Sequence, residues 1–311
     1  MLRHALPFLL PIFLFGLFAC ERPLDIEIPD SGSQLVIVSN FTTDQSLRVQ
    51  VSRSQPAVQP TKAVFILNAG VQLYEGPVFL ERLDLVRGED GRVPVYSTKN
   101  FQARVGTEYT IRVEVPGFSP VYATSSIPRQ ISLSDFKIFD LRHSNSSDTE
   151  EDEYHYTVSV SLEDPAEEKN YYHLNFFQQK LQYKALEGDT LITGSEMVAV
   201  EFSSSLNNNH LVANVTGGVL FDDKPFNGET VTYTFPFSVK VRTREELIGK
   251  LFAELRNVSE EYYHYNQSLS RQQANPDFPF SEPVHLFDNV ENGLGIFAGY
   301  NASLDSVSVS Y

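Results

Sequence analysis

Three histidines lie directly beside tyrosines: His155 in YHY, His173 in YYHL and His264 in YYHYN. A histidine serves as a general base or a metal ligand only where a nucleophile or further ligands lie close to it. The sequence contains none of the motifs G-x-S-x-G, H-E-x-x-H, G-x-x-x-x-G-K-S/T or G-x-G-x-x-G. We therefore expect these histidines to pack between aromatic neighbours, with no catalytic residue, no metal site and no cofactor. A site assembled from distant His, Asp and Ser residues is the alternative that the sequence leaves open.

The only cysteine, Cys20, offers a different kind of chemistry. Arg3 gives the chain a basic start, residues 5–18 are apolar apart from Gly and Pro, and Ala19 precedes the cysteine. This layout is that of a bacterial lipobox, in which a signal peptide is removed and the new terminal cysteine carries palmitate-type acyl chains. We expect residues 1–19 to be a lipoprotein signal peptide and Cys20 to be lipidated. The alternative is a signal anchor that ends in a buried cysteine.

Acidic residues follow the cysteine closely, at Glu21, Asp25 and Glu27, with prolines among them. They resemble the export tag that sends Bacteroidota lipoproteins to the outer face of the outer membrane. The alternative is an extended, solvated linker over residues 20–32. The tag predicts a lipid-anchored protein of the outer membrane that faces the cell surface.

Charge and length limit the function classes. The 311 residues carry 24 Lys and Arg against 40 Asp and Glu, a formal net charge of −16 at pH 7. This charge repels phosphate backbones, so we expect no nucleic-acid partner. The length is about twice the ~150 residues of a typical domain, which predicts two domains.

Short strands with alternating apolar and polar residues fill residues 33–128. In the run 108–115, for example, Tyr109, Ile111 and Val113 share one face of the predicted strand. Seven or so strands in this span predict an immunoglobulin-like or transthyretin-like β-sandwich.

Residues 129–311 are also rich in strand-like runs, at 152–164, 170–183, 191–202 and 229–243. They predict a second β-rich domain, so the fold class expected for the whole chain is mainly β.

One segment of this second domain has the spacing of a helix. Its apolar residues recur every three or four positions, at Leu247, Ile248, Leu251, Phe252 and Leu255. Thr243 and Glu246 form the pattern of a capping box. We expect a covering helix at about 244–256, and a further helical turn or two that begins at Ser259.

An acidic run, DTEEDE, occupies residues 148–153. It lacks the alternating oxygen ligands and central glycine of an EF-hand loop. We expect a solvated loop, with calcium binding as the alternative.

Four stretches of the chain, at 34–54, 163–177, 221–235 and 258–301, together resemble the Bacteroidota lipoproteins of the family named domain of unknown function 4249 (DUF4249). The carrying residues lie in the two middle stretches and near the end: Asp164, Pro165, Asn170, Tyr171, Tyr172, Asp222, Asp223, Phe226, Asn227, Gly228, Tyr262, Tyr263, Pro276, Phe280, Glu282, Pro283, Asn289, Gly293, Gly295, Phe297 and Gly299. The resemblance implies outer-membrane lipoproteins encoded beside TonB-dependent transporters. It implies no catalytic residues.

The resemblance thus implies a non-catalytic accessory or binding module of a TonB-dependent transport system, with the transporter barrel as partner. Two alternatives are a surface hydrolase on a β scaffold and a structural or adhesin protein of the envelope. The expected contact surface consists of aromatic residues, with core packing as the alternative for each: Tyr262, Tyr263, Tyr265, Phe297 and Tyr300.

Overall fold

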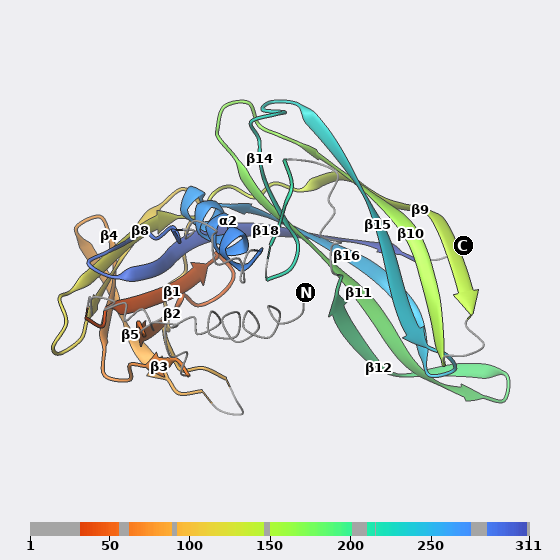
Figure 1. Ribbon diagram of the computed structural model, residues 1–311, viewed down its shortest axis with the longest axis horizontal. Coiled ribbons are helices and arrows are strands. Elements are labelled where there is room, and N and C mark those ends of the chain that lie inside the picture. Colours follow the sequence, from red (N-terminus) through yellow and green to blue (C-terminus); the bar gives the residue numbers. More distant parts are fainter. Residues whose placement is uncertain are drawn as a thin grey trace, which may run out of the picture. The chain divides into compact units, whose positions relative to one another are not determined.

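The computed structural model describes residues 32–55, 62–88, 92–145, 150–200, 210–214, 216–274 and 285–309. These residues form mainly strands, with one short helix near the C-terminus (Figure 1). The predicted mainly β fold class is therefore confirmed.

The strands before residue 128 are β1 (Leu35–Phe41), β2 (Arg48–Arg53), β3 (Val64–Phe65), β4 (Gly70–Glu75), β5 (Val78–Val86), β6 (Val95–Ser97), β7 (Glu108–Glu114) and β8 (Val121–Ser126). The later elements are β9 (Leu133–Asn145), β10 (Glu151–Glu163), β11 (Tyr171–Leu186), β12 (Asp189–Ala199), β13 (Val212–Ala213), β14 (Val219–Asp222), β15 (Thr230–Arg242), β16 (Glu246–Val258), α2 (Glu260–Ala274), β17 (Val290–Glu291) and β18 (Leu294–Ser308).

Residues from Ser33 onward form one compact unit. A continuous hydrogen-bonded path runs through its strands in the order β13-β14-β11-β16-β18-β1-β2-β6-β5-β4-β7-β8-β17, and β12 and β3 pair with β11 and β2 beside it. A separate three-stranded sheet has the order β15-β10-β9.

The last strand, β18, joins the two parts of the chain. Its residues 294–299 pair parallel with β1, and its residues 300–308 pair antiparallel with β16 (Figure 1). Two glycines of β18 allow close approaches to neighbouring backbone: a Cβ at Gly295 would lie 2.0 Å from the carbonyl oxygen of Ile37 on β1, and one at Gly299 would lie 2.2 Å from the carbonyl oxygen of Ser126 on β8. Neither position has room for a side chain.

The buried side chains form separate cores. The first core lies among β1, β2, β4 and β7, and it takes Val290 and Phe297 from the end of the chain. The second lies between the β11–β16 layer and the three-stranded sheet, where Phe176 packs against Phe235 and Phe237. The third is small and lies against α2. The division into two folding domains at residue 128 stays a prediction.

The helix expected at 244–256 is wrong, because these residues form most of strand β16. Leu251, Ala253 and Leu255 alternate into the second core, and β11 and β18 pair with the two edges of the strand. Because strands lie on both edges, the backbone N–H and C=O groups of β16 form their hydrogen bonds without a helix. The apolar residues fit both periods, so tertiary pairing decided the outcome.

The expected capping box at Thr243 and Glu246 is also wrong. Glu246 is buried in the turn between β15 and β16, where it accepts hydrogen bonds from the Arg242 backbone N–H at 2.9 Å and from its guanidinium NH2 at 2.7 Å. In this same turn Arg244 adopts a positive φ of 67°. The carboxylate thus closes a hairpin turn instead of capping a helix.

The further helix expected from Ser259 is confirmed as α2. The acidic run differs from a simple loop, since Glu151, Asp152 and Glu153 belong to β10 and Glu151 forms an ion pair of 3.3 Å with Lys240 on β15. No helix within the described ranges has the length and apolar character needed to cross a bilayer.

Candidate functional site

The predicted aromatic contact residues lie on α2 and β18, but most of them are buried. Tyr262 and Tyr263 pack in the third core, and Phe297 stacks on Phe41 in the first core, with ring centroids 4.5 Å apart. Tyr265 and Tyr300 are half-buried beside the third core. A contact surface that includes Tyr262, Tyr263 or Phe297 is therefore wrong for the folded chain, and the core-packing alternative describes these three.

Helix α2 begins where Ser259 caps it. The Ser259 hydroxyl accepts a hydrogen bond from the Tyr262 backbone N–H at 3.4 Å, and Glu260 and Glu261 occupy the first turn. Carboxylates at this end are stabilised by the helix dipole. Glu261 also accepts a hydrogen bond from the Ser125 hydroxyl of β8 at 3.1 Å. The helix is thereby tied to a strand of the first part.

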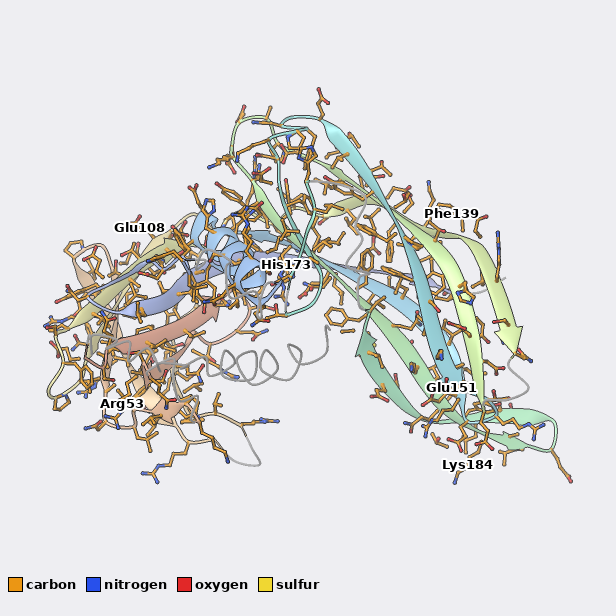
Figure 2. The ribbon with its side chains drawn as sticks, viewed as in Figure 1. Arg53, Glu108, Phe139, Glu151, His173 and Lys184 are labelled. Atoms are coloured by element: carbon orange, nitrogen blue, oxygen red, sulfur yellow. The ribbon has the colours of Figure 1, made fainter. Side chains whose placement is uncertain are left out.

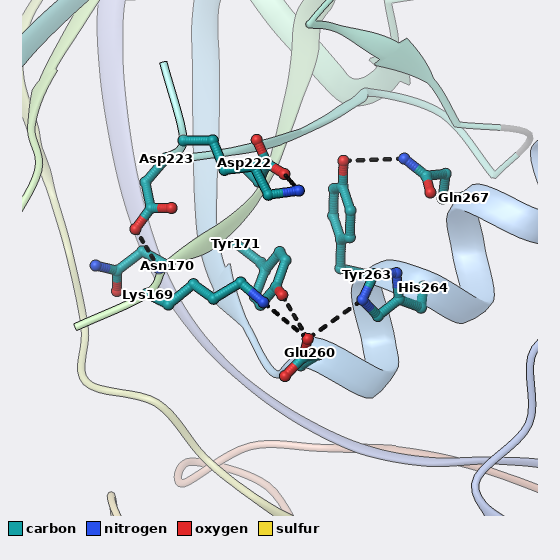
Figure 3. A network of polar contacts seen from close by, with 10 residues as sticks. Lys169, Asn170, Tyr171, Asp222, Asp223, Glu260, Tyr263, His264 and Gln267 are labelled. Carbon is teal, nitrogen blue, oxygen red and sulfur yellow. Dashed lines mark hydrogen bonds and ion pairs between the residues drawn. The ribbon is translucent and has the colours of Figure 1, made fainter. Parts of the chain in front are cut away.

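A polar cluster surrounds Glu260 at the surface of α2 (Figure 3). Three groups converge on its Oε1 atom: Lys169 Nζ at 2.9 Å, the Tyr171 hydroxyl at 2.7 Å and His264 Nε2 at 3.3 Å. The hydrogen bond from Lys169, followed by that from Tyr171, lowers the pKa of Glu260 to about 2. Burial raises the pKa of Tyr171 to about 12. This arrangement fixes a charged patch beside the helix start.

Beneath the helix lies His173, which Figure 2 labels beside α2. It is 2% exposed, and its Nδ1 atom lies 2.9 Å from the Tyr262 hydroxyl while its Nε2 atom lies 2.9 Å from the Gly217 carbonyl oxygen. Burial lowers the pKa of His173 to about 4. The ring is thus neutral at pH 7, and it donates from Nε2 and accepts at Nδ1.

The same network continues toward β18. Arg256 donates to the Tyr262 hydroxyl at 3.4 Å, forms an ion pair of 2.8 Å with Glu254, and lies 4.9 Å from the centroid of the Tyr300 ring. Arg256 and Glu254 both belong to β16. The contacts of Tyr262 and Arg256 therefore connect the buried His173 to the half-buried Tyr300.

Two carboxylates of the motif stretches hold loops together. Asp164 accepts hydrogen bonds from the Tyr172 hydroxyl and from the Gly228 backbone N–H, the latter at 3.0 Å. Asp223 accepts one from the Asn170 backbone N–H at 2.5 Å. Burial raises the pKa of Asp223. Both carboxylates have internal partners, so their chemistry is that of loop anchors.

Two other histidines named in the sequence analysis have different surroundings. His155 is exposed on β10, 3.6 Å from Glu153, and so does not pack between aromatic neighbours as expected. His264 does have such neighbours, with its ring near Tyr171, Tyr263 and Phe287. Across the described ranges, no three His, Cys, Asp or Glu side chains gather closely enough to hold a metal ion.

The predicted lipidation site Cys20 and the export-tag residues Glu21, Asp25 and Glu27 lie outside the described residues. No local sequence pattern indicates the partners of His173. Tyr262 is 89 residues away from it along the chain, and only the packing of α2 on β11 brings them together.

A comparison with protein families identifies one match: the model described as "Domain of unknown function (DUF4249)" matches residues 21–305. No curated protein matches the chain.

Proposed function

The chain belongs to the DUF4249 family, and on this premise we propose that it is a lipid-anchored outer-membrane protein that acts as a non-catalytic binding module of a TonB-dependent transporter. In this proposal Cys20 carries the lipid, Glu21, Asp25 and Glu27 direct the protein to the cell surface, and the transporter barrel is the partner.

The extent of the family match supports the anchor. The match begins at residue 21, directly after Cys20. Cys20 would be the first residue of the chain once a lipoprotein signal peptide is removed. Acyl chains each contribute ~0.8 kcal/mol per buried methylene, so a lipidated cysteine can hold a folded body at a membrane surface.

The non-catalytic role is supported by one observation: the polar residues in the stretches that resemble the family form hydrogen bonds inside the protein. Asp164, Asn170 and Asp223 are buried and bond to the backbone or side chains of neighbouring loops. Tyr172 is buried and donates to Asp164. Groups engaged in this way maintain a rigid shape, which suits a protein that presents a surface to a partner.

A second observation supports a rigid body. Because β18 pairs with β1 and with β16, the first and last strands of the described chain share one hydrogen-bonded path. A rigid module loses little conformational freedom when it binds, and this favours association.

The test is a purification of the tagged full-length protein from its native outer membrane in a mild detergent. We expect a TonB-dependent barrel to elute with it in stoichiometric amount. The same tag on an unrelated lipoprotein of that membrane controls for unspecific capture.

A lipoprotein that elutes alone would contradict the proposal and favour the structural or adhesin alternative. Turnover of a surface glycan or peptide by the purified protein would favour the hydrolase alternative.

A further inference from the structure

A pocket of about 320 Å³ lies where the two parts of the chain meet along β18. Strand β1 pairs with β18 as far as Phe41 and Gly299, and beyond this point the turn after β1 and the segment before β9 take its place beside β18. The pocket is lined by that turn, by Gln130, by Glu254 of β16 and by Tyr300, Asn301 and Ala302 of β18. Segments distant in sequence thus form one site.

The lining is rich in groups that exchange hydrogen bonds. It includes the carboxylates of Asp44 and Glu254, the amides of Gln45, Gln130 and Asn301, and the aromatic ring of Tyr300. Carboxylates accept hydrogen bonds, while amides both donate and accept them. The volume is at the small end of the ~300–1,000 Å³ typical of sites for small molecules.

Several of these groups are available to a ligand. Considering only the described residues, the side chains of Asp44 and Gln45 and the hydroxyl of Tyr300 have no hydrogen-bond partner. In contrast, Gln130 donates to the Ala302 carbonyl oxygen at 2.8 Å and Asn301 donates to that of Pro128 at 3.3 Å. Those two bonds hold the amides in place and leave their own carbonyl oxygens as acceptors.

The charge of the pocket selects against anions. Arg256 compensates Glu254 through their ion pair of 2.8 Å, whereas Asp44 has no cationic partner in the part of the chain that the structure describes. One uncompensated carboxylate repels phosphate, sulfate and uronate groups. A neutral ligand with many hydroxyls meets no such repulsion.

We propose that this pocket binds a neutral saccharide, a monosaccharide or the end residues of a short oligosaccharide. Adjacent hydroxyls of a sugar donate to Asp44 and accept from the Gln45 amide, and the apolar face of its ring packs on Tyr300. The inference rests on the proposed binding role, because it names the class of ligand that the module would hold.

The experiment is a binding titration by calorimetry of the full-length protein in a detergent without a sugar headgroup. The probes are glucose, galactose, mannose, xylose, N-acetylglucosamine and their common disaccharides. We expect at least one of them to bind with a stoichiometry of one. The matching uronic acid or sugar phosphate should bind at least about tenfold more weakly than its neutral parent.

Two variants test whether the saccharide binds in this pocket. Asp44→Asn and Gln45→Ala alter exposed turn residues without internal partners, so both variants should keep the unfolding temperature of the parent. Each should weaken saccharide binding by about tenfold. Glu108→Gln is the matched control, since Glu108 is an exposed acid on β7 that does not line the pocket (Figure 2); it should bind as the parent does.

A panel without any binder would overturn the inference, and so would binding that both turn variants leave unchanged. The purification described above distinguishes a wrong ligand class from a wrong transporter partnership. A barrel that co-elutes with a protein unable to bind saccharides refutes only the ligand class. Saccharide binding by a protein that elutes alone refutes only the transporter partnership.

Discussion

His173 shows how burial sets the protonation state of a single residue in this protein. Its ring is held between the Tyr262 hydroxyl and the Gly217 carbonyl oxygen, and burial lowers its pKa from 6.5 to about 4. Above pH 6.5 the ring is neutral in both the folded and the unfolded chain. Below this pH the unfolded chain binds a proton that the folded chain does not, so acidification favours unfolding.

We therefore expect the free energy of unfolding to fall as the pH drops from 6.5 to about 4, with about 3 kcal/mol lost through His173. Urea titrations at several pH values measure this slope. The variant His173→Gln should be less stable at pH 7 yet lose less stability over the same range. An equal slope in the variant would show that His173 does not cause the acid sensitivity.

Glu260 contributes at lower pH. Its pKa is lowered from 4.5 to about 2 by Lys169 and Tyr171, so its contacts stabilise the fold above pH 4.5 and are lost as the pH falls toward 2. Glu260→Gln should weaken the pH dependence only in this lower range, as measured by the same titrations. A changed slope between pH 6.5 and 5 in this variant would contradict the assignment.

At the scale of the element, β16 shows why a periodic pattern alone did not identify its secondary structure. Leu247 and Leu251 are four residues apart and would share one face of a helix or of a regular strand. In β16 a bulge separates them: Gln178 pairs with Leu251 while Lys180 pairs with Ile248, which leaves one extra residue in β16. Leu251 is therefore 0% exposed in the second core, whereas Leu247 is 38% exposed.

This difference predicts unequal costs for the same substitution. Leu251→Ala should lower the free energy of unfolding by about 2–5 kcal/mol, because it leaves a cavity in the core. Leu247→Ala should cost less than about 1 kcal/mol. Chemical denaturation of both variants measures the two values, and equal losses would contradict the bulge between the two leucines.

At the scale of the whole molecule, the first part of the chain depends on the last strand. Val290 and Phe297 fill the first core, and β18 satisfies one edge of β1. A fragment of residues 33–128 loses these contacts. We expect the fragment to lack the dispersed NMR spectrum of a folded domain, while residues 33–311 unfold in a single transition. A folded fragment would instead establish an independent first domain, as the sequence predicts.

The anchor is also a property of the whole molecule. Cys20→Ser should remove incorporation of labelled palmitate and release the protein from the outer-membrane fraction, because the acyl chains supply the membrane affinity. Glu108→Gln should keep both properties. Continued palmitate labelling of the Cys20→Ser variant would contradict lipidation at this residue.

The residues alone predicted the mainly β class and the start of α2 at its Ser259 cap, and four stretches spread along the chain indicated the family. The first two features depend on local periodicity and on capping, which are properties of short segments.

Long-range contacts fix residues 246–258 as a strand, bury Tyr262, Tyr263 and Phe297, and bring Asp44 and Tyr300 to one pocket. Each of these depends on segments that lie far apart in the chain. Both edges of β16 are paired by strands that begin at Tyr171 and Leu294, and no local pattern specifies such partners. Strand pairing and burial are decided by the whole chain at once, because the free energy of a residue depends on neighbours that folding alone brings to it.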